Sequence, residues 1–219
     1  MKRTLLQFSS VVVSEAHNPT ILNPNFLETE GIVPRSWGWE VVDTITTPPF
    51  AVVRYSNGVA ITVEQNKLQV TDSHLGHDPK GSKVTEIASA YARVLRHVHY
   101  TAVGNNFQSL IQLDTPDIYL KKRFLKQGPW DDSKRTLDAL GIRLFYSLDP
   151  GRLTFSVDSG KAKLPDNAVE QPAIIVNANF DRKCGNHPAF EQVCELLENA
   201  MDDWETCQDT LSDILKEGK

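Results

Sequence analysis

The sequence predicts an α+β fold, in which an antiparallel sheet built from two hairpin-strand-helix units is covered by helices, including one long C-terminal helix. Two β-rich regions that each contain a turn signal, and an apolar stripe at helical spacing near the C-terminus, point to this class. The chain has 219 residues, 40% of them hydrophobic, which is enough to bury a core without a disulfide or a metal. We expect a single domain over 1–219, in which 40–114 and 115–219 are pseudo-repeat halves.

The N-terminal region predicts one strand followed by an irregular segment. Residues 4–13 are rich in Val and Leu and favour a strand. Asn-Pro pairs then interrupt 17–39, which nevertheless contains too many apolar residues for a free linker. We expect this segment to pack irregularly on the core surface. Its tryptophans, Trp37 and Trp39, are candidate anchors for a partner, although packing at the core or the edge is the simpler interpretation.

The middle of the chain predicts a three-stranded meander, then a helix, a strand and a short helix. Asn57 and Gly58 separate two β-rich runs and favour a tight primed turn, because both central residues must accept a positive φ. The expected elements are strands over 52–56, 59–63 and 68–71, a helix over 83–97, a strand over 100–113 and a helix over 117–126.

The second half predicts the same order of elements. Asp149, Pro150 and Gly151 mark a turn between two β-rich runs, and a third β-rich run follows. The expected strands cover 142–147, 153–157 and 174–180. Two units of hairpin, strand and helix could join their edges into one antiparallel sheet, with the helices on one face.

One continuous amphipathic helix is predicted for the last thirty residues, with Pro188 in its first turn. Apolar residues occupy three of every seven positions, which is typical of a helix that covers a core. The stripe consists of Phe190, Val193, Cys194, Leu197, Ala200, Met201, Trp204, Cys207, Leu211, Ile214 and Leu215, with Gln208 as its polar exception. Nine acidic residues but only two lysines follow Asn186, and we interpret these acids as a solvated face unsuited to nucleic acid or anionic lipid.

Cysteine usage and hydropathy predict a cytoplasmic protein. The three cysteines have no paired spacing, which points to a reducing compartment. No stretch approaches the ~20 apolar residues that span a bilayer, so no membrane association is expected.

Asp72, His74, His77 and Asp78 form the only dense cluster of possible metal ligands in the sequence. Zinc or iron sites need three or four converging ligands, usually with one that is distant in sequence, and His97 or His99 could supply it. A polar loop, with a histidine at the C-terminus of the next helix, is the simpler interpretation.

Two further patterns come close to chemical motifs. The segment 76–83 resembles a phosphate-binding loop, but its serine and lysine stand in the wrong order, so we expect Ser82 to cap the next helix. Cys184 precedes the last helix and is near His187 in sequence, yet no third group is evident to orient the histidine as a base. We therefore predict no catalytic residue and no cofactor.

A basic patch with an aromatic residue nearby is formed by Lys121, Lys122, Arg123, Lys126 and Trp130. Positive charge combined with base stacking is how proteins hold single-stranded nucleic acid. Four basic residues on a short helix are more often simply its solvated face. The patch is kept as a weak candidate for partner binding.

The leading hypothesis is a cytoplasmic, bacterial, non-catalytic interaction or accessory protein, whose sheet and 17–39 segment present a surface to another protein or to a second copy. The first alternative is a metal-dependent hydrolase or nuclease that uses the 72–78 His/Asp cluster. The second alternative is a nucleic-acid-binding accessory protein that uses the basic patch at 121–126.

Overall fold

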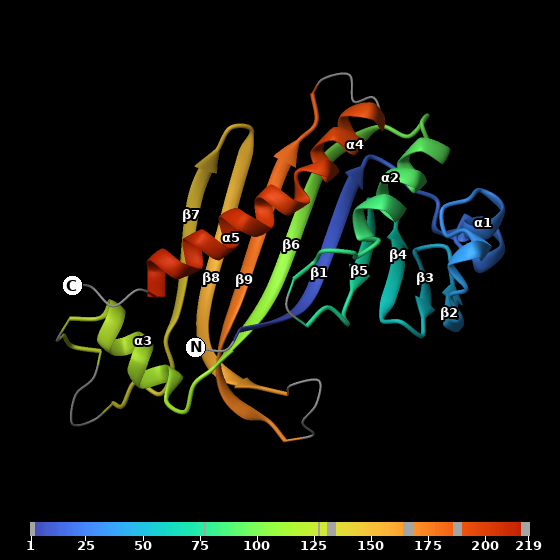
Figure 1. Ribbon diagram of the computed structural model, residues 1–219. Helices are drawn as coiled ribbons and strands as arrows, with labels where there is room; N and C mark the ends of the chain where they lie inside the picture. The colour runs from blue at the N-terminus through green and yellow to red at the C-terminus, as the bar shows by residue number, and fades with distance from the viewer. Residues whose placement is uncertain are drawn as a thin grey trace.

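The structure of the protein, a computed structural model, describes residues 3–76, 78–126, 128–130, 135–163, 169–185 and 190–215. In these residues nine strands form one antiparallel sheet in the order β2-β3-β4-β5-β1-β6-β9-β8-β7 (Figure 1). The strands are β1 (Arg3–Ser14), β2 (Val41–Thr46), β3 (Phe50–Tyr55), β4 (Val59–Glu64), β5 (Lys67–Asp72), β6 (Tyr100–Gln112), β7 (Gly141–Leu148), β8 (Gly151–Ala162) and β9 (Gln171–Lys183). The predicted combination of an antiparallel sheet with helices is confirmed.

Every predicted strand is present, but the first hairpin turn differs from the prediction. β3 ends at Tyr55 and β4 begins at Val59, so three residues form the loop. Gly58 has a φ of +88°, whereas Asn57 keeps a negative φ. A type I turn followed by one left-handed residue is the usual three-residue solution, and it needs glycine only at the last position. The hairpin is therefore confirmed, while the primed two-residue turn is wrong.

Long pairings lie at the centre of the sheet, where β6 bonds to both β1 and β9. β6 pairs with β9 along its length, and this pairing joins the two expected halves of the chain in one sheet. β1 lies between β5 and β6, so the N-terminal strand completes the centre rather than an edge. The strand order does not test whether 40–114 and 115–219 are pseudo-repeat halves, so the internal repeat stays a prediction.

Helices cover one face of the sheet (Figure 1). α2 (Val84–Val94) packs against β1 and β5, whereas α4 (Phe190–Glu198) and α5 (Ala200–Leu215) pack against β6. α3 (Pro116–Phe124) contacts β8 and β9 at the end of the sheet where α5 finishes. The short helices η1 (Pro19–Ile21), α1 (Pro24–Thr29) and η2 (Arg35–Trp37) lie at the opposite end, near β2 and β3.

The C-terminal helix is bent, which corrects the prediction of one continuous rod. α4 ends at Glu198 and α5 begins at Ala200. Between them, the side-chain amide of Asn199 donates to the Glu195 carbonyl at 3.3 Å, and such bonding to the preceding turn competes with the backbone and bends helices. The stripe still covers the core, because Leu197 is 0% exposed and Trp204 is 9% exposed. A bend of this kind lets an apolar stripe follow a twisted sheet.

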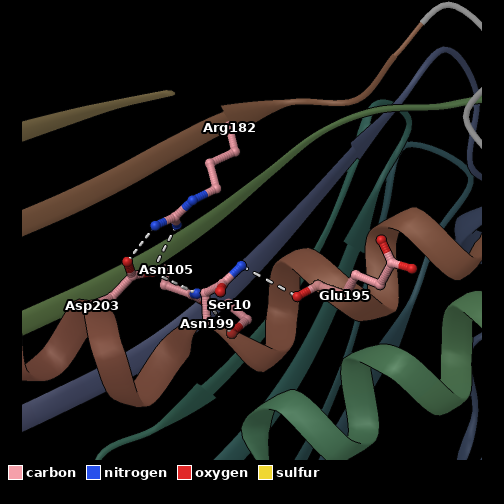
Figure 2. A network of polar contacts seen from close by, with 6 residues as sticks. All are labelled: Ser10, Asn105, Arg182, Glu195, Asn199 and Asp203. Carbon is pink, nitrogen blue, oxygen red and sulfur yellow. Dashed lines mark hydrogen bonds and ion pairs between the residues drawn. The ribbon is translucent and has the colours of Figure 1, made fainter. Parts of the chain in front are cut away.

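A buried polar network fixes α5 on the sheet (Figure 2). Arg182 of β9 donates through both terminal nitrogens to the Asp203 carboxylate, with Nη1 at 2.8 Å. Asn105 of β6 donates to the same carboxylate at 3.0 Å and accepts from the Ser10 hydroxyl at 2.7 Å. Asp203 is only 2% exposed, so the prediction that the acids of this helix form a solvated face is wrong for this residue. Its charge is compensated by bidentate pairing with a buried guanidinium.

Candidate functional site

β2 and β7 are the two edge strands of the sheet, and β2 is the more exposed of them. All six residues of β2 are exposed. Val42 is 59% exposed and Ile45 is 42% exposed, although both are aliphatic. The run from Val41 to Thr46 is rich in β-branched residues, and this local signal would have been sufficient to predict the strand.

The inner side of β2 is firmly attached to its neighbour. Thr47 and Phe50 exchange backbone hydrogen bonds of 2.9 and 3.2 Å, which closes the turn between β2 and β3. The Arg54 guanidinium pairs with the Asp43 carboxylate across the two strands. The Thr46 hydroxyl donates to the Leu22 carbonyl at 3.1 Å and ties the strand to the N-terminal segment. The pairing register shifts between Val41 and Asp43, which marks a bulge.

A pocket of about 400 Å³ opens beside this edge, between the N-terminal segment and the start of β2. It is lined by Pro24, Glu28, Val33, Pro34, Arg35, Gly38, Trp39, Glu40, Val41 and Tyr55. Glu28 forms an ion pair with Arg35, so these two charges neutralise each other at the rim. The Glu40 carboxylate is exposed and remains as the net charge of the lining.

Aromatic residues build the wall of this pocket. The rings of Trp37 and Trp39 lie 4.8 Å apart, and the ring of Trp39 meets that of Tyr55 edge-on at 5.4 Å. Gly38 has a φ of +66° between the two tryptophans, a conformation that disfavours any side chain. Burial, with a smaller contribution from Glu28, raises the pKa of Tyr55 to about 12. The phenol of Tyr55 is therefore neutral at physiological pH. On the neighbouring Trp37, the Lys83 Nζ lies 5.2 Å from the centroid of the indole ring.

The structure brings most of the basic candidates together. Lys121, Lys122 and Lys126 line one pocket with Trp130, at the end of α3. Arg123 points elsewhere, because its Nε donates to the Ile214 carbonyl at 3.0 Å in the last turn of α5. Arg123 faces α5 together with Tyr119, because residues four apart share a face of a helix.

The metal candidates do not converge in the described residues. Asp72 is buried, and its carboxylate accepts from the His74 backbone at 3.1 Å and from the Ser82 hydroxyl at 2.8 Å. His99 instead contacts Glu15 at 3.0 Å, beyond the opposite end of β5. Six residues of extended chain place these two sites on the order of 17 Å apart.

Within the residues that the structure describes, no group of three or more His, Cys, Asp or Glu side chains could hold a metal. His77 lies outside those residues. The prediction that Ser82 caps α2 is wrong, since the cap position falls on Lys83 and Ser82 bonds to Asp72 instead.

The thiol candidate has little support from its surroundings. Cys184 is half-buried, and this burial raises its pKa, which disfavours the reactive thiolate. His187, its suggested partner, lies outside the described residues. Burial also raises the pKa of Cys207, to about 12, so this thiol is a packing group of the α5 stripe.

Comparison with known proteins assigns no family to the chain, because neither a protein-family model nor a curated protein matches it. Among the described residues, no helix has both the length and the apolar composition needed to cross a membrane.

Proposed function

We propose that the protein is a non-catalytic, cytoplasmic interaction protein that binds an extended segment of another protein along β2. The observation that carries the proposal is the combination of an open strand edge, exposed aliphatic side chains and an aromatic pocket at one place. Addition of a strand to a sheet edge supplies affinity through main-chain hydrogen bonds, and adjacent pockets supply specificity through side chains. The free thiols of Cys184, Cys194 and Cys207 support the location in a reducing compartment.

The backbone groups available to a partner follow from the β2–β3 pairing. Thr47 and Phe50 are a hydrogen-bonded pair, and such pairs alternate with pairs whose backbone groups point outward. The backbone N–H and C=O groups of Ile45 and Asp43 therefore point toward β3. Those of Thr44 and Thr46 point away from it. A partner strand would bond to this outward series.

The edge has little protection against strand addition beyond the bulge at its start. Natural edge strands carry bulges, lysines, prolines or inward-pointing charges that discourage pairing, and in β2 the residues after the bulge, from Asp43 to Thr46, pair in regular register. β2 contains no lysine and no proline, and its single charge, Asp43, is neutralised by Arg54. An exposed six-residue edge with Val42 and Ile45 therefore favours association.

The pocket indicates the chemistry of the partner. Trp39, Tyr55 and Val33 offer an apolar surface, and the pocket volume of about 400 Å³ is enough for one large side chain of a peptide. Glu40 leaves a net negative charge at the rim. The segment that fits is thus β-prone and carries an aliphatic or aromatic anchor next to a lysine or arginine.

Charge argues against a second copy as the occupant. The stretch from Glu40 to Thr47 contains two acidic residues and no basic one. Pairing of two β2 strands would bring four carboxylates to one interface, and only the two Asp43 groups have a cation partner within their own chain. Uncompensated like charges disfavour this contact.

The test selects ten-residue peptides from a random library on the full chain and measures the affinity of the enriched sequences. We expect a consensus with an apolar anchor beside a basic residue. Thr44→Pro removes an outward N–H without removing a bond to β3. It should lower the peptide affinity about tenfold or more, because a hydrogen bond is lost and the proline ring obstructs the partner strand. Thr44→Ala is the matched control, because it keeps the N–H.

Equal peptide affinity of Thr44→Pro and Thr44→Ala, with both variants folded by circular dichroism, would contradict strand addition. A dimer in light scattering that Thr44→Pro dissociates would assign the edge to a second copy instead.

A further inference from the structure

A second pocket, of about 380 Å³, lies at the C-terminal end of α3. This helix is at the far end of the sheet from β2 (Figure 1). It is lined by Lys121, Lys122, Leu125, Lys126, Gly128, Trp130 and Leu137. Among the described residues, three ammonium groups and no carboxylate belong to this lining. In the part of the chain that the structure describes, none of the three lysines has an ion-pair partner. The described part of the lining therefore carries three positive charges and no negative one.

The aromatic residue of the pocket is held in place by its surroundings. A Cβ atom at Gly128 would lie 2.3 Å from the Trp130 ring, so the indole rests directly on the glycine backbone. The Arg135 guanidinium donates to the Pro129 carbonyl at 3.0 Å and fastens the same turn. Trp130 nevertheless remains 44% exposed, which is high for the largest apolar side chain. One ring surface is packed and the rest is available for stacking.

The orientation of α3 separates its structural residues from the pocket. Tyr119 donates to the Leu215 carbonyl at 2.7 Å and Arg123 donates to the Ile214 carbonyl, so this helix face is attached to α5. Leu120 is fully buried. The lysines at 121, 122 and 126 are left on the remaining surface, and within the described part of the chain their ammonium groups form no ion pair.

From this arrangement we infer that the pocket binds a nucleotide unit of single-stranded nucleic acid, with a base stacked on Trp130 and adjacent phosphates contacted by Lys121, Lys122 and Lys126. Stacking on an aromatic ring combined with a cationic path for the backbone is the general means of holding single strands. The stretch 121–135 contains six basic and two acidic residues, so the local charge is strongly positive although the chain carries −5 overall. This inference uses a different surface from the strand edge and does not depend on it.

The test measures fluorescence anisotropy of a labelled ten-nucleotide single strand with the full chain at 50 and 200 mM NaCl. Neutralisation of three phosphates gives a logarithmic salt slope of about −2 for single strands, which means about 16-fold weaker binding at the higher salt. The triple variant Lys121→Gln, Lys122→Gln, Lys126→Gln should bind at least tenfold more weakly at 50 mM NaCl and lose the salt dependence.

A charge-matched control replaces three exposed lysines elsewhere, in the variant Lys80→Gln, Lys161→Gln, Lys183→Gln. It should bind within about twofold of the unmodified chain, because these lysines lie outside the pocket. Trp130→Ala should weaken binding about tenfold, and Trp130→Phe should restore most of the loss, since phenylalanine also stacks.

Several results would overturn the inference. No binding at 50 mM NaCl would remove it, as would equal losses in the two triple variants. Unchanged affinity in Trp130→Ala would mean that the pocket binds through its positive charge alone, without base stacking. If a mononucleotide bound as tightly as the ten-nucleotide strand, the ligand of the pocket would be a free nucleotide and not an extended strand.

Discussion

The pockets beside β2 and beside α3 have similar volumes, about 400 and 380 Å³, but different chemistry. β2 and α3 themselves lie at opposite ends of the sheet (Figure 1). Beside β2, Glu28 and Arg35 neutralise each other, and the pocket offers aromatic walls next to an open backbone edge. Beside α3, three lysines have no acidic counterpart in the lining. Size therefore does not distinguish the two surfaces. Charge and backbone geometry do, and our proposals of a peptide at one end and a nucleic acid at the other rest on them.

This difference has an energetic consequence. Main-chain hydrogen bonds and apolar contacts at β2 are short-range, so added salt should change them little. Contacts between lysines and phosphates release counterions, so salt should weaken them steeply. The predictions that follow test whether the two ends are independent, and they run from the largest expected effect to the smallest.

Asp203→Ala should have the largest effect, because it leaves the buried Arg182 guanidinium without its carboxylate. Loss of one partner of a buried pair typically costs about 3–5 kcal/mol of unfolding free energy. Urea denaturation followed by circular dichroism measures this value. Asp202→Ala is the control, since its exposed neighbouring carboxylate should contribute almost nothing. Equal stability of the two variants would contradict the anchoring of α5 by this network.

Gly38→Ala should have the next largest effect and should act only at the β2 end. Its φ of +66° is a left-handed conformation, which costs roughly 1–2 kcal/mol for a residue with a Cβ. The substitution should also lower the affinity for a selected peptide, because Gly38 positions Trp39 at the pocket. Oligonucleotide affinity should stay unchanged. A matching loss of oligonucleotide affinity would mean that the two ends are coupled. Ser36→Ala, at an exposed position in the same turn, is the control.

His17 should make the stability of the fold pH-dependent. Burial lowers the pKa of its imidazole, so the folded protein binds this proton less readily than the unfolded chain does. The unfolded state then binds more protons below about pH 6.5, and stability must fall as the pH decreases through that range. Urea midpoints at pH 7.5 and 5.5 measure the loss. His17→Leu should reduce it, and an identical loss in both proteins would show that other groups are responsible.

Arg123→Gln should have the smallest effect, and it separates the fold from the basic pocket. Its Nε bond to the Ile214 carbonyl caps the C-terminus of α5, where a cation contributes about 0.3–1 kcal/mol. We expect a slightly lower thermal midpoint with unchanged oligonucleotide affinity. Lys122→Gln should show the reverse, weaker oligonucleotide binding at the same midpoint. If Arg123→Gln lost as much oligonucleotide affinity as Lys122→Gln, Arg123 would belong to the binding surface.

Strands and helices could be predicted well because their signals are local. Alternating β-rich runs placed β3, β4 and β5, and the apolar stripe placed the residues that cover the core, including Leu197 and Trp204. The bend at Asn199 was missed, because one side-chain bond to the Glu195 carbonyl interrupts a pattern that otherwise continues. β2 was also missed, although its β-branched composition was visible in the sequence.

The candidate sites were predictable only where their residues are close in sequence. Lys121, Lys122 and Lys126 lie within two helical turns of one another, and the structure places them with Trp130 as the pattern suggested. Asp72 and His99 seemed equally compatible as metal ligands, yet they lie towards opposite ends of β5. Spacing in sequence gives no information about which end of a strand a later loop will reach.

The sequence by itself determined the α+β class, most element positions and the apolar stripe of the C-terminal helix, because backbone geometry imposes periods of 2 and 3.6 on local patterns. Only the tertiary structure decided which strand became the open edge, which acid was buried and which aromatic rings met at a pocket. Asp203 of α5 illustrates the reason. Its carboxylate is buried because Arg182 of β9 and Asn105 of β6 both bond to it. Burial of a charge depends on such distant partners, and no local pattern encodes them.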